Sequence, residues 1–380
     1  MARFDYLLVG GGLQNSLLCC AIAALQPKAR VALIERDTVG GNHTWCFHAT
    51  DVDREMLHVA TPLIEHTWSG YDVAFPGRER RLDGDYHCVT SERLRHVVST
   101  LCETHRGLEL YLGHSATAVF ADRVELSNGT CLQGRAVIDA RGPTFLAATD
   151  IAGYQKFLGL EVELEQPHGL ARPLLMDARV EQLDGYRFVY VLPFGARRAL
   201  VEDTYFSEHS ALDAVALRAR LLEYLHARGL RVTKVLREET GTLPLPGRLP
   251  PPASEPPLTA GYQGGWFHPT TGYSFPLAAR LAHVVARQSP EALFGPELLD
   301  MIREQGRQLR FATLLNRLMF SGFEPETRWN VFERFYRLPS PTIARFYALA
   351  TTPFDRARIL CGRPPRGISL RRAVTREMNS

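Results

Sequence analysis

Residues 5–18 read DYLLVGGGLQNSLL, and this stretch decides the fold. An apolar run ends in three glycines, and two further apolar segments, SLLCCAIAAL and RVALIERD, follow. This order predicts a strand, a tight turn, a helix and a second strand, which together make one βαβ unit. Gly10 permits the tight turn, Gly12 lets the backbone approach a pyrophosphate, and the helix beginning at Leu13 supplies free N–H groups.

The spacing Gly10-x-Gly12-x-x-Asn15 therefore predicts a dinucleotide-binding turn, although Asn15 stands where Gly or Ala is usual. Glu35 ends the second strand, 25 positions after Gly10, where a carboxylate can accept hydrogen bonds from ribose hydroxyls. The alternative is a glycine-rich turn in an unrelated α/β protein. The motif alone does not distinguish NAD from FAD.

Two later stretches favour FAD. The strand VIDARG at 137–142 places Asp139 and Gly142 back at the nucleotide turn. The stretch HPTTGYSFP at 268–276, with Thr270, Thr271 and Gly272, precedes a helix whose N-terminus could face a flavin ring. Many flavoproteins carry a Gly-Asp pair just before this point, whereas this chain reads AGYQGGWF with no Asp.

Composition limits the classes of function. The 380 residues are 45% apolar and 22% charged, with a net charge of +3, which does not indicate nucleic-acid binding. The seven cysteines form no CxxC and show no zinc-site spacing with histidines, so we expect no metal and a reducing, cytoplasmic setting. We find neither a signal peptide nor an apolar stretch of about 18 residues that would span a membrane.

The order of segments predicts an α/β fold in which two domains are interleaved. We expect a Rossmann-type FAD-binding domain and a mostly antiparallel substrate domain, followed by a helical and basic C-terminal region. A capping box at Ser210–Asp213 opens one predicted helix, and residues 242–257 form a proline-rich loop. The predicted FAD-binding ranges are 1–60, 89–155 and 258–290, the substrate ranges are 61–88 and 156–257, and the helical range is 291–380.

Six stretches together carry a resemblance to a known family. They are DYLLVGGGLQNSLL, GGNHTWCFH at 40–48, VTSERLR at 89–95, VIDARG, LVEDT at 200–204 and FHPTTGYSFP at 267–276. In this order they resemble the bacterial flavin-dependent lycopene β-cyclases of carotenoid synthesis, over about three quarters of the chain. The family's Phe-x-Glu-Glu-Thr motif reads Leu-Val-Glu-Asp-Thr here, so the resemblance supports Glu202 more firmly than Asp203 as catalytic residue.

The resemblance implies the reaction and the remaining site residues. The ψ-ends of lycopene would close to β-ionone rings, through γ-carotene to β-carotene, without net oxidation. FAD would act in its reduced form, with NADPH or NADH as reductant. Asn42, Trp45 and Arg93 would join the cofactor site. A redox flavoenzyme acting on a polyprenoid, a reductase or a hydroxylase, is the alternative, as is a non-enzymatic nucleotide-binding protein.

The acid motif fits the chemistry that cyclisation needs. An alkene is a poor base, so its proton donor must be a protonated carboxyl group, and burial raises a carboxyl pKa. In an extended RALVEDTYF strand, Glu202, Thr204 and Phe206 share one face and Asp203 the other, unless a bulge intervenes. We expect Glu202 to donate the proton and Asp203 to anchor the sheet or hold a partner. The alternative is a strand that emerges into solvent with two surface acids.

Other residues are weaker candidates. Aromatic rings can stabilise a carbocation, although core packing is the usual role of such residues. His268 is a candidate for proton handling, with a structural hydrogen bond as the alternative. A substrate that resides in the bilayer implies attachment to the cytoplasmic membrane surface through the basic and apolar C-terminal region, with a solvated basic tail as the alternative. The aromatic candidates are Tyr186, Phe188, Tyr190, Trp266, Phe267 and Tyr273, and the membrane candidates are Arg356, Arg358, Ile359, Leu360, Arg363, Arg366, Leu370, Arg371 and Arg372.

Overall fold

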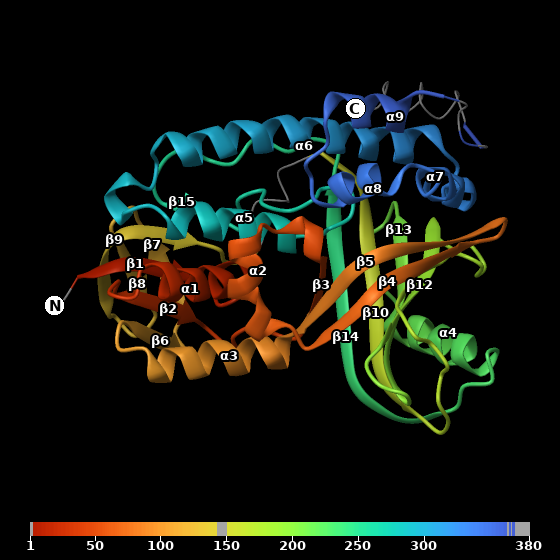
Figure 1. The fold of residues 1–380 in the computed structure, drawn as a ribbon, viewed down its shortest axis with the longest axis horizontal. Helices are drawn as coiled ribbons and strands as arrows, with labels where there is room; N and C mark the ends of the chain where they lie inside the picture. The colour runs from red at the N-terminus through yellow and green to blue at the C-terminus, as the bar shows by residue number, and fades with distance from the viewer. Residues whose placement is uncertain (1–2, 143–149, 363–364, 366, 369–380) are drawn as a thin grey trace.

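Two β-sheets organise the computed structural model, which describes residues 3–142, 150–362, 365 and 367–368 (Figure 1). The first sheet has the order β6 (Leu108–Leu112), β2 (Val31–Glu35), β1 (Phe4–Val9), β9 (Cys131–Asp139), β8 (Arg123–Leu126) and β7 (Ala116–Val119), with β15 (Leu258–Thr259) also paired to β9. Strands β6, β2, β1, β9 and β15 run parallel. This is the predicted Rossmann-type layer.

The second sheet is the predicted, mostly antiparallel one. Its order is β14 (Val232–Pro246), β10 (Ile151–Leu164), β13 (Arg198–Ser207), β12 (Tyr186–Pro193), β11 (Leu174–Asp177), β4 (His66–Phe75), β5 (Arg78–Thr90) and β3 (Thr44–His48). Only the β11–β4 pairing is parallel. Both β13 pairings keep a continuous register, so no bulge interrupts the strand that carries the acid motif.

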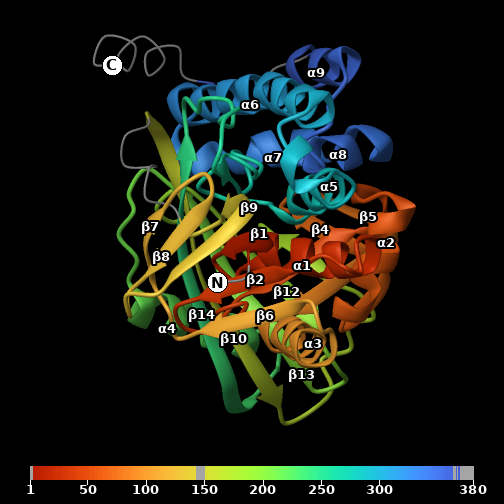
Figure 2. The same ribbon diagram turned by 90° about the vertical axis from the view of Figure 1, so that its left-hand side faces the viewer.

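Helices surround both sheets. They are α1 (Leu13–Leu25), α2 (Arg54–Ala60), α3 (Ser91–Thr104), α4 (Ala214–His226), α5 (Phe275–Ala286), α6 (Pro296–Gly322), α7 (Trp329–Phe335), α8 (Ser340–Tyr347) and α9 (Pro353–Leu360), with short 3₁₀ turns η1 (Ala49–Asp51), η2 (Thr61–Leu63), η4 (Pro290–Ala292) and η5 (Pro325–Thr327). Figure 2 shows α6 as an outer layer above α5, α7 and α8. The helical C-terminal region is thus confirmed over its described residues.

The first βαβ unit forms because its strand is buried on both sides. Tyr6 and Leu8 of β1 pack with Leu17 of α1, whereas Leu7 and Val9 pack into a second cluster on the opposite face. A nearly continuous apolar run, such as residues 6–9 here, is typical of a strand in a parallel sheet covered on both faces. The predicted strand–turn–helix–strand order is confirmed.

Two local predictions differ from the structure. Asp213 itself caps α4 by accepting from the Ala216 N–H at 3.0 Å, so Ser210 opens no capping box. The predicted proline-rich loop begins inside β14, where Pro244 and Pro246 are tolerated because β14 is an edge strand.

Strand β3 pairs with β5 in the second sheet, although residues 44–48 fall within the predicted FAD-binding range 1–60. The pairing is between segments far apart in sequence, which local patterns do not show. The division of the chain into a cofactor part and a substrate part by residue range otherwise stays a prediction.

Helix α4 covers one face of the second sheet. Leu217, Leu221 and Leu225 of this helix pack against Leu158 and Val201 of the central strands. The opposite face is covered by the β3 segment and by the C-terminal helices, which carry Phe320 and Phe332 into a cluster with Tyr186, Phe188 and Phe206. The two faces of β13 therefore meet different surroundings.

Candidate active site

The glycine turn lies at the carboxyl edge of the first sheet. Val9 of β1 is paired with Asp139 of β9, and Gly10 follows with φ +93°. A Cβ at Gly10 would lie 2.8 Å from the Ala140 carbonyl oxygen, so only glycine fits there. A Cβ at Gly12 would meet nothing within 4 Å. The turn thus combines a closely packed backbone with open space, as a bound pyrophosphate requires.

The N-termini of α1 and α5 lie side by side at this turn. Gln14 Nε2 donates to the Ala278 carbonyl at 3.2 Å near the start of α1 and α5, and Gln26 Nε2 donates to Ala286 at 2.8 Å near their ends. The two helices therefore run parallel. Neither N-terminus has a side-chain cap or an acidic residue in its first turn. Two uncapped helix dipoles at one place favour an anionic ligand.

Glu35 is built into the turn. Its Oε2 accepts from the Gly11 N–H at 2.6 Å, and its Oε1 accepts from the Asp37 N–H at 2.9 Å. The Gly40 N–H donates to the Gly11 carbonyl at 2.9 Å, which joins the next predicted motif to the turn. These residues and the two helix ends fit a dinucleotide such as FAD.

Other residues predicted to bind the cofactor have different contacts. Asn15 Nδ2 donates to the Val9 carbonyl at 3.0 Å, so its amide ties the helix to β1 instead of facing the space at Gly12. Arg93 Nε donates to the Pro62 carbonyl at 2.8 Å. It is Arg95, which the sequence did not single out, that holds the 39–41 turn, donating to Gly41 at 2.9 Å.

Leu13, Asp139 and Gly142 do lie at or beside the turn. Leu13 is the buried first residue of α1, and a Cβ at Gly142 would meet nothing within 4 Å. Asp139 is buried, and its carboxylate accepts from Arg141 Nε at 2.9 Å and Nη2 at 2.8 Å. This ion pair fixes the end of β9 next to Gly10.

The segment after Gly41 carries the site toward the second sheet. Asn42 Nδ2 donates to the Glu238 carbonyl of β14 at 2.9 Å, and its Oδ1 accepts from Arg237 Nη1 at 3.0 Å. Trp45 lies on β3 with its ring edge-on to His43, 5.1 Å between centroids. This segment therefore bridges the glycine turn and β14.

The HPTTG loop at 268–272 reaches the face of the second sheet that is turned away from α4. A Cβ at Gly272 would lie 2.9 Å from Leu243 of β14 and 3.3 Å from Gln155 Oε1 of β10. Thr270 Oγ1 donates to the Ala312 carbonyl of α6 at 3.0 Å, and Thr271 Oγ1 accepts from the Tyr273 N–H at 3.4 Å. The loop is thus held between α6 and the second sheet just before α5 begins.

Glu202 lies on that face of β13, and the predicted alternation is confirmed. Thr204 Oγ1 donates to Glu202 Oε1 at 2.5 Å, and Tyr190 of β12 stands directly opposite Glu202. Within the described part of the chain, Glu202 enters no ion pair. Burial raises its pKa to about 8, the nearby Glu239 adds to the rise, and the Thr204 hydrogen bond opposes it. A carboxyl group in this state can hold its proton at neutral pH.

Asp203 points to the opposite face, under α4. Its carboxylate accepts from Arg187 Nε at 2.8 Å and Nη2 at 3.0 Å, and from the Tyr205 hydroxyl at 2.9 Å. All of these groups are buried or nearly so. A paired carboxylate of this kind anchors the sheet, which is one of the two roles expected for Asp203.

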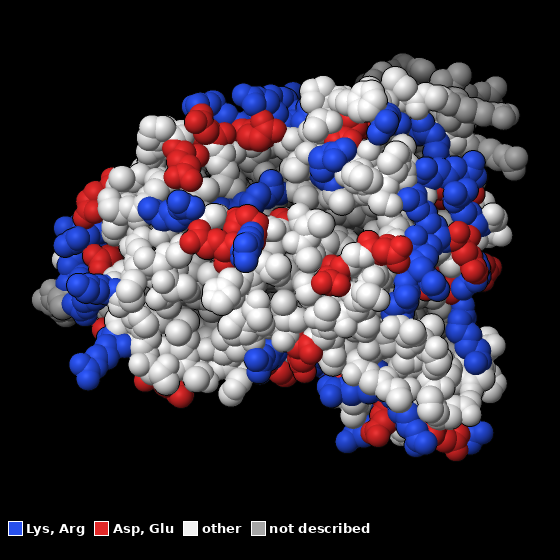
Figure 3. All heavy atoms as spheres, in the orientation of Figure 1, with Lys and Arg blue, Asp and Glu red and all other residues white. Residues whose placement is uncertain are grey.

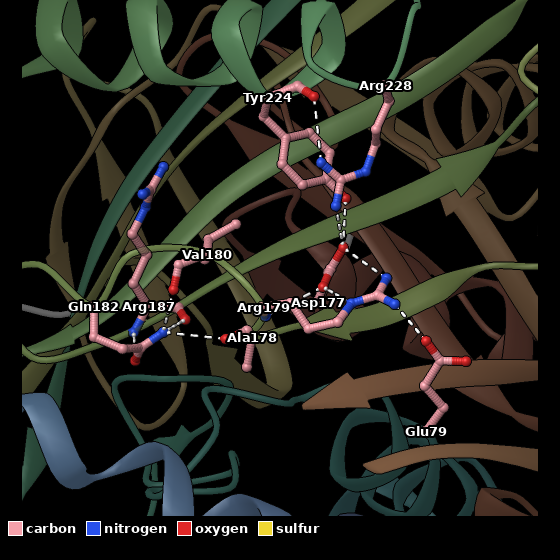
Figure 4. Close-up of polar contacts among 9 residues, drawn as sticks. All are labelled: Glu79, Asp177, Ala178, Arg179, Val180, Gln182, Arg187, Tyr224 and Arg228. Carbon is pink, nitrogen blue, oxygen red and sulfur yellow. Dashed lines mark hydrogen bonds and ion pairs between the residues drawn. The ribbon is translucent and has the colours of Figure 1, made fainter. Parts of the chain in front are cut away.

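Asp177 repeats this arrangement in the same row of the sheet, two strands away (Figure 4). It stands opposite Val189, which stands opposite Asp203, so both acids share one face. Its carboxylate accepts from Arg179 Nε at 2.8 Å, Arg228 Nη2 at 2.6 Å and the Tyr224 hydroxyl at 2.9 Å. Although burial opposes ionisation, these partners hold the pKa of Asp177 below its usual value.

His268 and most of the predicted aromatic residues are packing residues. Burial lowers the pKa of His268 to about 3, and its Nδ1 accepts from the Thr270 N–H at 3.1 Å. Tyr186, Phe188, Trp266 and Phe267 are buried in the core clusters, and the Tyr273 hydroxyl donates to Asp51. Tyr190 differs, since its hydroxyl lies 3.2 Å from that of Tyr86 on the Glu202 face.

Three residues near Glu202 were missed by the sequence analysis. Gly159 of β10 lies directly opposite Glu202, and Glu239 of β14 lies opposite Gly159. Phe157 stands opposite Thr204, and its ring lies over Gly241. The available signals were a glycine inside an alternating strand and a second acidic pair at 238–239, but neither shows which strands become neighbours.

Comparisons with known proteins show the family of this chain. The family model described as lycopene cyclase protein matches residues 5–373. The lycopene beta-cyclase of Pseudescherichia vulneris is 42% identical over 95% of this chain and 94% of its own length. That of Pantoea ananas is 39% identical over 96% and 95%, and that of a Paracoccus species is 37% identical over 95% and 94%.

Solved structures share the fold at low identity. A probable FAD-dependent monooxygenase of Pseudomonas aeruginosa, pqsL, has a TM-score of 0.61 and 18% identity, covering 86% of this chain and 98% of its own. A geranylgeranyl bacteriochlorophyll reductase-like protein of Thermoplasma acidophilum has a TM-score of 0.63 and 14% identity, covering 95% and 99%. The glycine turn thus sits in the fold of flavin-dependent enzymes, and by sequence this chain belongs to the lycopene cyclase family.

Proposed function

We propose that this protein is a lycopene β-cyclase, which closes the ψ-ends of lycopene to β-ionone rings, through γ-carotene to β-carotene. The reaction is an acid/base isomerisation without net oxidation. The observation that carries the proposal is Glu202, a carboxyl group that enters no ion pair among the described residues and whose pKa is raised to about 8 by burial. Such a group is protonated at pH 7 and can act as a general acid.

In this proposal each ring closure begins with proton transfer from Glu202 to an alkene carbon. The resulting carbocation closes the ring, and loss of a proton from the neighbouring carbon restores a neutral product. Thr204 holds the acid by its hydrogen bond at 2.5 Å. Tyr190, directly across from Glu202, presents a ring to the same face, where a cation is stabilised by roughly 0.5–2 kcal/mol.

The cofactor part of the proposal rests on the glycine turn. FAD in its reduced form would supply negative charge beside the carbocation. The backbone at Gly10, Gly12 and Leu13 would hold the pyrophosphate, and Glu35 the ribose. The α5 N-terminus, preceded by Thr271 and Gly272, would lie by the flavin. NADPH or NADH would serve as reductant, and flavin absorbance during anaerobic titration with each one tests this.

An anaerobic assay tests the cyclase. Lycopene in liposomes is incubated with protein carrying chemically reduced FAD, and products are separated by chromatography. We expect β-carotene from the wild type and a loss of about 10²-fold or more in Glu202→Gln, since general acid catalysis contributes roughly 10²–10⁴-fold. Glu163→Gln on β10 is the control, because Glu163 is exposed and the chemical change is the same.

Flavin content is measured in every variant, so that loss of cofactor is separated from loss of proton transfer. Full activity in FAD-loaded Glu202→Gln would remove Glu202 from the proposal. Stoichiometric oxidation of nicotinamide with a polyprenoid, while lycopene stays unchanged, would support the redox flavoenzyme instead.

We also propose that the protein binds the cytoplasmic face of the membrane peripherally through its C-terminal region. No helix within the described ranges is both long and apolar enough to cross a bilayer. Phe354 and Leu360 of α9 are 64% and 46% exposed, and the Arg358 guanidinium lies 4.2 Å from the Phe354 ring. Figure 3 shows Lys and Arg gathered over the nearby end of the molecule, where α7 and β5 lie. Exposed apolar residues among basic ones favour an anionic lipid surface.

Of the residues predicted for this contact, Arg356, Arg358, Ile359 and Leu360 belong to α9. Arg363, Arg366, Leu370, Arg371 and Arg372 lie outside the described residues. Co-sedimentation with vesicles containing anionic lipid tests the surface: Phe354→Ser with Leu360→Ser should weaken binding several-fold. Val215→Ser on α4, a more exposed apolar residue, is the control, and an equal effect there would contradict the assignment.

A further inference from the structure

A row of facing residues crosses three strands of the second sheet. Gly159 of β10 is paired with Glu202 of β13 on one side and with Glu239 of β14 on the other. Residues directly opposite one another in neighbouring antiparallel strands point to the same face. Glu202 and Glu239 are therefore on one face, separated only by a residue that has no side chain.

Glu239 leans over this gap. A Cβ at Gly159 would lie 3.1 Å from Glu239 Cγ and 3.5 Å from Glu239 Oε1, and 3.4 Å from Leu200 Cδ1. Neighbouring strands are about 4.8 Å apart, so two strands would otherwise place the acids nearly 10 Å from each other. The missing side chain at Gly159 lets the Glu239 carboxylate approach Glu202.

Glu239 is buried, at 3% exposure, and it is held as a carboxylate. Arg237 Nη1 donates to Glu239 Oε2 at 2.6 Å, and Thr44 Oγ1 donates to the same oxygen at 3.2 Å. Both bonds thus end on Oε2, whereas Oε1 is the oxygen over Gly159. Arg237 is shared, because its Nε also donates to Glu161 at 3.1 Å.

We propose that Glu239 is a positioning residue, whose fixed negative charge, acting across Gly159, keeps the Glu202 carboxyl group in its acid form. This inference rests on the proposed role of Glu202. A neighbouring carboxylate disfavours a second negative charge at short range, and the burial of Glu239 strengthens the effect. The direction agrees with Glu239 being the largest charge effect on the pKa of Glu202 after burial.

The other charged groups near Glu202 do not cancel this effect. Asp203 faces the opposite side and is neutralised by Arg187. Glu161 is paired with Arg198 and Arg237, one row farther along the strands. His43, which faces Glu239 and Arg237, has its pKa lowered by burial and is neutral. Glu239 is also paired with Arg237, but Arg237 contacts Oε2 and is shared with Glu161, so negative charge is left on Oε1 over Gly159.

The arrangement also suits the proton balance of the reaction. One proton is added to an alkene carbon and one is removed from a neighbouring carbon, so the acid must end each cycle protonated. After donation, Glu202 is a carboxylate beside the Glu239 carboxylate. Repulsion between the two favours the return of a proton to Glu202 before the next ring closure.

The test compares two neighbouring acids of β14. Glu239→Gln removes the charge on the Glu202 face, and Glu238→Gln is the matched control, because Glu238 points to the other face and pairs with Arg218 at 2.6 Å. The titration of Glu202 is followed in FAD-loaded protein by the infrared carbonyl band that disappears in Glu202→Gln. The upper pH limit of kcat is measured in parallel.

We expect the Glu202 midpoint to fall by about one pH unit, a tenfold change in proton affinity, in Glu239→Gln and to stay in place in Glu238→Gln. Glu239→Asp, which retains the charge, should keep most of the wild-type midpoint and guards against a variant that folds poorly. An unchanged midpoint in well-folded Glu239→Gln would overturn the inference. Full activity in Glu202→Gln would instead overturn the proposed function, so the two failures are distinguishable.

Discussion

The two faces of β13 hold neighbouring carboxyl groups in opposite electrostatic surroundings. Asp203 meets an arginine and a tyrosine hydroxyl, and Asp177 in the same row is neutralised in the same way. Glu202 meets a threonine hydroxyl and, across Gly159, another carboxylate. Burial alone therefore does not set the role of an acid. The groups that contact a buried acid decide whether it is an ionised carboxylate that stabilises the sheet or a protonated carboxyl group that can donate its proton.

The largest difference should be in folding stability. Asp203→Asn leaves the buried Arg187 guanidinium without a counter-charge, which typically costs about 3–5 kcal/mol. Glu202→Gln removes a carboxyl group that has no such partner. At pH 5, where most of the pH-dependent contribution of Glu202 is retained, it should change the free energy of unfolding by less than about 1 kcal/mol. Urea unfolding measures both. Equal losses would show that the two acids contribute alike to stability. Partial recovery in Asp203→Leu combined with Arg187→Met would show that the unpaired Arg187 charge causes the loss.

The pH dependence of stability should report the Glu202 carboxyl group itself. The pKa of Glu202 is about 8 in the folded chain against 4.5 unperturbed, so between these values the folded state binds more protons than the unfolded state. This stabilising contribution is complete below about pH 4.5 and is lost as pH rises to about 8. The slope approaches about 1.4 kcal/mol per pH unit.

Unfolding measured from pH 5 to 8 in wild type and Glu202→Gln isolates this contribution as their difference. Activity should fall above about pH 8 for the same reason, since the acid form is lost. A wild-type curve parallel to that of the variant would show that Glu202 titrates normally.

The smallest effects should come from the two hydroxyl donors. Tyr205→Phe removes a bond to Asp203 and should cost about 1 kcal/mol of stability, with the pH limit of activity unchanged. Thr204→Val removes the bond that opposes the raised pKa of Glu202, so the upper pH limit of kcat should move upward. Unfolding and pH–rate profiles are measured for both variants. The same loss of stability and the same pH limit of kcat in both would contradict the difference proposed between the two faces.

Local sequence signals predicted much of this. The glycine turn, Glu35 and the alternation around Glu202 follow from residues close together in the chain, where strand period and turn geometry decide the outcome. Glu239 and Gly159 could not be recognised, because they meet Glu202 only through the pairing of β14 and β10 with β13. Asn15 was assigned to the cofactor site from its motif position, but its amide donates to the Val9 carbonyl of β1. The sequence does not show which distant strands pair, nor that the Asn15 side chain is directed toward β1.

Pro244 and Pro246 at the end of β14 have a consequence for the molecule in a crowded cell. An open sheet edge is a template on which another chain can add a strand, and this is a common route to aggregation. Proline cannot donate the backbone hydrogen bond that such an added strand needs. The edge that carries Glu239 is therefore protected at this end against self-association.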